Sequence, residues 1–245
     1  MSERPVAIIS DVAEYVGPAL ARRLAATHDL VLGDAGADLV AELRAAGATV
    51  VPVANARDLS QSDATDRLVG AAIERFDRLD SAVAFTGAIV VGRFLRSSVD
   101  DLRSALVGCV EAPYNFLRAV VPPMIERGGG QVLLFTSAAG ARPTPGAPLY
   151  STARAAANML VRNVAAEVAD TNVQVNAIGT NFMDFPGFLR ANRADDAQGR
   201  VRVESMVPMG RLGTMEELAH FALPFVDGRS RFTTGQFVAF AGGWA

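Results

Sequence analysis

The chain has 245 residues and a formal net charge of −3, with 50% of its residues hydrophobic and 20% charged. This length suits one α/β domain, and no lysine and arginine run offers the clustered basic face that nucleic acid requires. With one cysteine, Cys109, and two histidines, His28 and His220, an internal disulfide and a Cys- or His-based metal site are excluded. No stretch is apolar for the about 18 residues of a membrane span, so we expect a cytoplasmic protein with no membrane partner.

Short apolar runs alternate along the chain with segments of helical spacing. The predicted strands are 6–10, 30–34, 49–53, 80–85, 131–136, 173–178 and 237–240. The predicted helices are 17–27, 37–46, 62–77, 98–127 and 148–168. Residues 179–209 show no simple period, and Thr214 with Glu217 forms a capping-box pattern that opens a further helix. This alternation predicts one Rossmann-like α/β domain over 1–245, a doubly wound parallel sheet of about seven strands flanked by helices.

The turn after the first strand is where a doubly wound sheet binds a dinucleotide, because glycines there let a diphosphate approach the helix N-terminus. In residues 10–17 the spacing matches T-G-x-x-x-G-x-G, but Asp11 and Tyr15 take the first two glycine positions. The ring of Tyr15 would occupy the place of the diphosphate, and the carboxylates of Asp11 and Glu14 would repel it. We therefore expect a turn closed to NAD(P), and we interpret Asp34 as an ordinary residue after a strand.

A second cluster of polar residues lies later in the chain. Ser137 follows the predicted strand 131–136, Tyr150 opens the next helix, and Arg154 comes four residues on. Residues at i and i+4 share one face of a helix, and Ser137 can point into the same cleft. Each residue alone has an ordinary structural explanation, but the three together predict a catalytic site. A cation beside a tyrosine favours the phenolate, so that Tyr150 can take a proton.

The chain resembles the short-chain dehydrogenase/reductase superfamily over nearly its whole length. Residues 210–217 and 234–243 match the C-terminal pattern of that superfamily. Three places depart from the reductases: N-N-A-G after the fourth strand is Ala-Phe-Thr-Gly at 84–87, the usual helix asparagine is Cys109, and the usual P-G is replaced within 179–182. Cys109 itself reads as a packed thiol.

Within this superfamily the chain is similar to the halohydrin dehalogenases, which carry Arg where the reductases carry Lys. Their loop pattern, T-x4-[F/Y]-x0–1-G, is matched by Ser10, Tyr15 and Gly17 with Ser in place of Thr. The resemblance implies a homotetramer that needs no cofactor. It implies conversion of a vicinal haloalcohol to an epoxide, halide and a hydrogen ion by intramolecular substitution, with Ser137 and Tyr150 on the substrate hydroxyl. The reverse reaction would open an epoxide with halide, azide, cyanide or nitrite.

A halide pocket follows from the same resemblance, because a segment after a strand can direct backbone N–H groups toward an anion. The residues expected to bind the halide or nucleophile are Tyr15, Thr180, Asn181, Phe182 and Met183. The residues expected around the substrate are Phe85, Ala139, Phe185 and Phe188. Aromatic residues in the irregular segment are equally typical of a plain core. Whether Trp244 packs on its own sheet or reaches a neighbouring subunit stays open.

Two other functions remain as alternatives. The chain could be an NAD(P)H-dependent short-chain reductase with a divergent nucleotide loop, which nucleotide binding would reveal. It could also be a non-catalytic Rossmann-like binding or regulatory protein. Against the second alternative stands the intact Ser137, Tyr150 and Arg154 set, because sequence drift would not preserve it.

Overall fold

In the computed structural model, which describes residues 4–245, seven strands form one parallel sheet in the order β3-β2-β1-β4-β5-β6-β7. The strands are β1 (Val6–Ile9), β2 (Asp29–Gly33), β3 (Val50–Val53), β4 (Ser81–Phe85), β5 (Gly130–Ser137), β6 (Val173–Thr180) and β7 (Phe237–Phe240). The strand order reverses between β1 and β4, so a crevice forms beyond their carboxyl ends. The predicted Rossmann-like fold class is confirmed. The first three residues of the predicted 1–245 domain lie outside the described residues.

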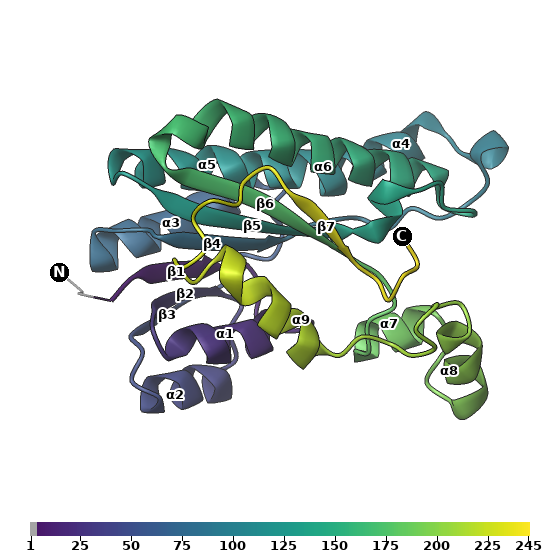
Figure 1. Ribbon diagram of the computed structural model, residues 1–245, viewed down its shortest axis with the longest axis horizontal. Helices are drawn as coiled ribbons and strands as arrows, with labels where there is room; N and C mark the ends of the chain where they lie inside the picture. Colours follow the sequence, from purple (N-terminus) through teal and green to yellow (C-terminus); the bar gives the residue numbers. More distant parts are fainter. Residues whose placement is uncertain (1–3) are drawn as a thin grey trace.

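Helices cover both faces of the sheet (Figure 1). One face carries α1 (Gly17–Ala25), α2 (Ala37–Ala45) and α9 (Met215–Ala222). The other carries α3 (Ser62–Phe76), α4 (Val99–Leu106), α5 (Ala112–Glu126) and α6 (Pro148–Val168). Two short helices, α7 (Pro186–Ala191) and α8 (Ala197–Glu204), lie together at one end of the molecule. Within residues 4–245, no helix combines the length and the apolarity that a membrane crossing demands.

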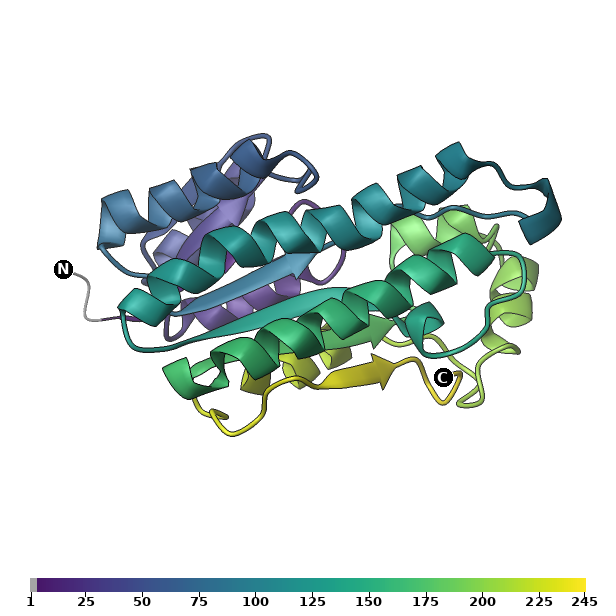
Figure 2. The same ribbon diagram turned by 90° about the horizontal axis from the view of Figure 1, so that it is seen from above.

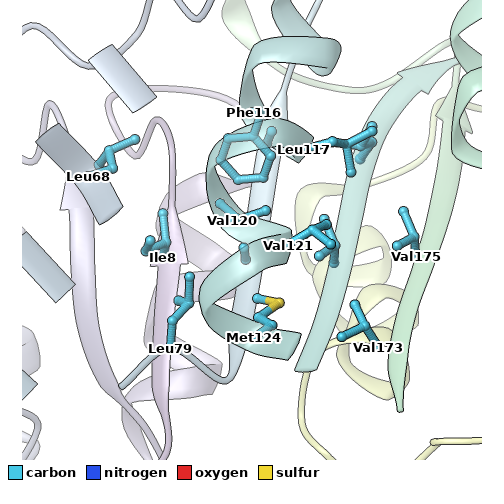
Figure 3. Close-up of a cluster of buried hydrophobic side chains, with 14 of the residues drawn as sticks. Ile8, Leu68, Leu79, Phe116, Leu117, Val120, Val121, Met124, Val173 and Val175 are labelled. Atoms are coloured by element: carbon cyan, nitrogen blue, oxygen red, sulfur yellow. The ribbon is translucent and has the colours of Figure 1, made fainter. Parts of the chain in front are cut away.

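The core consists of two apolar layers, one on each face of the sheet. Because both faces are covered, the central strands read as continuous apolar runs, as in β1 where every residue is fully buried. On the α5 side, Phe116, Val120 and Met124 point onto the strands and meet Ile8 (Figure 3). Each such side chain contributes about 1.5–3 kcal/mol on burial. This packing fixes the carboxyl ends of the strands, including the end of β5 where Ser137 lies.

Two segments differ from their predictions. The predicted helix 98–127 is three successive segments: α4, a π-helical turn η2 (Val107–Glu111) and α5, which run on as one long rod beside α6 (Figure 2). Pro113 causes the change, because its ring removes an N–H and crowds the carbonyl four residues earlier. The segment 179–209, predicted to be irregular, contains α7 and α8. Elsewhere the predicted bounds lie within about two residues of the observed ones.

Candidate active site

Ser137 lies at the carboxyl end of β5 and is 6% exposed. Its hydroxyl accepts a hydrogen bond from the Ala139 N–H at 3.1 Å and donates a long one, 3.4 Å, to the carbonyl of Thr180. The long bond is a weak one. The hydroxyl can therefore be redirected toward a bound molecule with little loss.

Tyr150 lies in the first turn of α6, and two hydrogen bonds fix this helix against the end of β5. Ser151 Oγ donates to the carbonyl of Ala139 at 2.8 Å, and Thr136 Oγ1 donates to Asn158 Oδ1 at 2.9 Å. Both bonds join α6 to the segment that carries Ser137. Tyr150 is partly buried against the cluster of Ala105, Cys109, Leu149 and Ala153. The fold thus holds Ser137 and Tyr150 in a fixed relation.

Arg154 is 5% exposed, and its contacts are made mostly with the segment after β4. Its Nη2 donates to the carbonyl of Thr86, and its Nη1 donates to Thr86 Oγ1 at 3.3 Å. Its Cζ lies 5.1 Å from the centroid of the Tyr150 ring, a cation–π distance. A side chain at Gly87 would collide with this guanidinium, since its Cβ would lie 1.8 Å from Nη2. Thr86, which accepts its hydrogen bonds, and Gly87, which leaves room for it, together form the binding position of Arg154, called its seat below.

Tyr15 lies across the crevice from β1 to β6. Its hydroxyl donates to Thr180 Oγ1 at 2.6 Å, and its ring packs edge-on to Phe85, Phe135 and Phe185. Burial raises the pKa of Tyr15 well above its ordinary value, an effect that outweighs the lowering by Thr180 and Arg154. The phenol therefore stays protonated at neutral pH and keeps its hydrogen bond. Its backbone has φ of 59°, the left-handed region.

The segment after β6 uses many of its backbone N–H groups internally. The N–H of Phe182 donates to Asn181 Oδ1 at 2.9 Å, and that of Asn181 points to the carbonyl of Phe240 at 3.4 Å. Met183 pairs with Gly213 in an isolated bridge, and its side chain is buried. These three residues border a cavity of about 320 Å³ that neither Ser137 nor Tyr150 lines.

The four residues predicted around the substrate lie in two groups. Phe85 and Phe185 join Tyr15 in the aromatic cluster and line a crevice of about 290 Å³ at the ends of β1 and β4. Phe188 packs on Phe182 in a second cluster, with ring centroids 6.0 Å apart, and its ring also lies 6.4 Å from that of Phe185. Ala139 is buried beside Ser137, and its backbone N–H donates a hydrogen bond to the Ser137 hydroxyl.

Arg57 is a functional candidate that the sequence analysis missed. Its Nε lies 2.9 Å from Asp11 Oδ2, and its Nη2 lies 3.9 Å from Glu14 Oε2. The predicted repulsion between these carboxylates and a diphosphate is therefore partly offset by a cation at the same place. Arg57 follows β3 at the carboxyl edge of the sheet, and that position was the available signal.

These features define an enzyme of the short-chain dehydrogenase/reductase class. A family model described as enoyl-(acyl carrier protein) reductase matches residues 12–245, so the chain belongs to this family. A curated relative, 2,5-dichloro-2,5-cyclohexadiene-1,4-diol dehydrogenase LinX of Sphingobium indicum, is 28% identical over 98% of this chain and 96% of its own length. The 3-oxoacyl-[acyl-carrier-protein] reductase of a Synechocystis species is 27% identical over 97% of this chain and 96% of its own.

Solved structures agree on the fold. Levodione reductase superimposes with a TM-score of 0.85 at 24% identity, over 99% of this chain and 98% of its own. YwfH, described as an NADPH dependent reductase involved in bacilysin biosynthesis, gives a TM-score of 0.87 at 19% identity, over 99% of both chains.

The expected halohydrin dehalogenase, a lyase that makes epoxides without a cofactor, is wrong. The relatives above are dehydrogenases and reductases that match nearly the whole chain, and the family model agrees with them. The expectation rested on a few positions: Asp11 and Tyr15 in the first turn, Arg154 in place of lysine, and the departures at 84–87, Cys109 and 179–182. The halide role expected for Tyr15, Thr180, Asn181, Phe182 and Met183 belonged to that reaction, so it is not proposed for this protein. Of the alternatives, the short-chain reductase is favoured.

Proposed function

We propose that the protein is an oxidoreductase that interconverts a carbonyl and a secondary alcohol on a small, largely apolar substrate, with a nicotinamide nucleotide as redox partner. The observation that carries the proposal is that two hydrogen bonds, Ser151 to Ala139 and Thr136 to Asn158, hold the start of α6 with Tyr150 against the end of β5 with Ser137, in a chain from a reductase family. The names of its relatives, a diol dehydrogenase and an oxoacyl reductase, support the same reaction type.

The chemistry of these two hydroxyls suits a reacting oxygen. When a carbonyl becomes an alcohol, its oxygen gains negative charge and then a proton, and both changes are favoured by positioned donors. Ser137 Oγ would donate a hydrogen bond to that oxygen in place of its long bond to Thr180. Tyr150 would supply the proton, and it would remove the proton in the reverse direction.

Arg154 would act through other groups. Its buried charge lies 5.1 Å from the centroid of the Tyr150 ring, a cation–π contact that helps to fix this ring at the start of α6. Its two bonds to Thr86 fix the segment after β4 that borders the crevice. We therefore assign it a positioning role.

Phe85 and Phe185 support an apolar substrate. They come from β4 and from the segment before α7, and they present rings at the carboxyl edge of the sheet. Such rings favour a substrate with an alkyl or aryl group beside its oxygen-bearing carbon, because each buried CH₂ contributes about 0.8 kcal/mol.

The residues of the first turn do not fit a dinucleotide as they stand. Gly17 keeps the close approach that such a turn needs, since its Cβ would lie 2.2 Å from the carbonyl of Asp11. The carboxylate of Asp34 already accepts from the N–H groups of Asn55 and Ala56, at 2.7 and 3.0 Å. The ring of Tyr15 fills the space where a diphosphate would pass.

The experiment is a spectrophotometric assay of NADH and NADPH oxidation with a panel of small ketones, and of NAD⁺ and NADP⁺ reduction with the matching secondary alcohols. We expect turnover of apolar members of the panel. Tyr150→Phe should lower kcat by at least about 100-fold, because a general acid–base group contributes that much.

Tyr114→Phe is the matched control, since it is the same substitution at a half-exposed tyrosine of α5. It should leave the rate unchanged. The proposal is contradicted if no ketone or alcohol is turned over with either nucleotide, or if Tyr150→Phe keeps most of the rate.

A further inference from the structure

Tyr15 has a backbone conformation that favours glycine, and it lies in the β1–α1 turn at a position where a nucleotide-binding loop carries glycine. Its φ of 59° lies in the left-handed region, which side chains other than Asn and Asp rarely adopt. Such a conformation persists only when the surroundings hold it. The turn therefore has the shape of a nucleotide loop with a phenol ring added to it.

The surroundings that hold Tyr15 come from the opposite side of the crevice. The hydrogen bond from its hydroxyl to Thr180 joins residues 165 positions apart, and the ring of Phe185 is 4.9 Å away from its own. Thr180 is the last residue of β6, and Phe185 directly precedes α7. The contact thus links the β1–α1 turn to the segment after β6.

We propose that Tyr15 determines access of the dinucleotide to the crevice and that Thr180 is its latch. The proposal rests on the function proposed above. In the latched state the ring occupies the path of the diphosphate. Binding requires the Tyr15–Thr180 hydrogen bond to break and the ring to leave the aromatic cluster.

Among the described residues that line it, an opened crevice would offer a diphosphate one cation, Arg57. Asp11, Glu14 and Asp58 border the crevice, and Arg57, which pairs with the first two, has a side chain that is 59% exposed. The hydroxyl of Thr86 and the small Gly87 border the same crevice.

A closed state that dominates lowers the apparent affinity by the fraction of molecules that are open. Tyr15→Phe and Thr180→Val each remove the hydrogen bond and keep the rest of the packing. A net hydrogen bond is worth a factor of about 3 to 10, so both variants should bind nucleotide tighter by that factor. Tyr15→Gly also removes the ring and relieves the backbone, and it should bind at least about 30-fold tighter.

The test measures the Kd of NADH and of NADPH by nucleotide fluorescence for wild type, the three variants and Tyr114→Phe, with thermal melts to verify folding. Tighter binding in Tyr15→Phe and Thr180→Val but not in Tyr114→Phe supports the latch. Equal Kd values in wild type, Tyr15→Phe and Thr180→Val overturn it. These two variants decide the question even if Tyr15→Gly does not fold.

The outcome is separable from that of the proposed function. Tighter nucleotide binding with no turnover of any ketone or alcohol by any variant would leave the latch and remove the oxidoreductase. Turnover by wild type with unchanged Kd values in all variants would support the oxidoreductase and overturn the latch.

Discussion

The guanidinium of Arg154 donates two hydrogen bonds to Thr86, and its Cζ lies 5.1 Å from the centroid of the Tyr150 ring. The side chain is almost fully buried, and its Nε has no partner within residues 4–245. The stability of this buried cation therefore rests on its hydrogen bonds to Thr86 and on its contact with the Tyr150 ring. Arg154 therefore couples the segment after β4 to the start of α6.

Replacing Arg154 with Met should lower the free energy of unfolding by about 2 kcal/mol, because the carbonyl of Thr86 loses a charged partner. Arg154→Lys keeps the charge but lacks the fork that reaches both atoms of Thr86, so we expect a smaller loss. Urea denaturation measures both. Arg162→Met, an exposed arginine further along α6, is the control. Equal stability of wild type and Arg154→Met would show that the seat contributes nothing.

Gly87→Ala should destabilise the fold by about 2 kcal/mol or more. Its φ of +132° is strained for alanine, and the added Cβ would displace Arg154. In an Arg154→Met background the displacement no longer matters, so the loss should shrink to about 1 kcal/mol. Thermal or urea denaturation of the double-mutant cycle gives the coupling, and purely additive losses would argue against the contact.

Trp244 packs on Phe182, with ring centroids 5.5 Å apart, and Arg142 stacks on its indole at 4.7 Å. Arg142 also donates to the Trp244 carbonyl. In this chain, then, Trp244 does pack on its own subunit. Trp244→Ala should lower the free energy of unfolding by about 1–3 kcal/mol through lost burial and stacking. Phe232→Ala, at a fully exposed aromatic, should change it by less than about 0.5 kcal/mol in the same denaturation series.

Glu217 predicts a pH dependence of stability. Its hydrogen bonds with Arg211, and then with the Thr214 N–H, lower its pKa from 4.5 to about 2. Because the folded protein favours the ionised form, this contribution is present above pH 4.5 and is lost as the pH falls toward 2. Glu217→Gln keeps the capping bond but loses the exposed charge pair with Arg211, so it should be less stable than wild type by about 0.2–1 kcal/mol at pH 7. The gap should narrow below pH 4.5 in urea titrations, and a gap that is constant down to pH 2.5 would contradict this origin.

The sheet and its helices could be predicted from the sequence because buried strands and amphipathic helices have their own periods. The bounds of α6 and β7 match their predictions, and the capping box at Thr214 is present. The helices α7 and α8 were missed because six and eight residues are too short for a period to show. Asp196, which caps α8, was the local signal.

The candidate site was harder to predict, because its contacts join distant segments. Neither the seat of Arg154 on Thr86 nor the pairing of Arg57 with Asp11 has a local sequence pattern. The function was misjudged for a related reason. The departures from the reductases at Asp11, Tyr15, Cys109 and Arg154, and within 84–87 and 179–182, are outweighed by the match to the reductase family over residues 12–245. The homotetramer stays a prediction.

The most direct measurement of the central claim is isotope transfer. The protein is incubated with a small apolar ketone and a nicotinamide nucleotide deuterated at its redox-active carbon, and the alcohol is analysed by mass spectrometry. We predict one deuterium in the alcohol from wild type and from Tyr114→Phe, and at least about 100-fold less from Tyr150→Phe. An alcohol fraction without deuterium, or no alcohol at all across the ketone panel, would contradict the account.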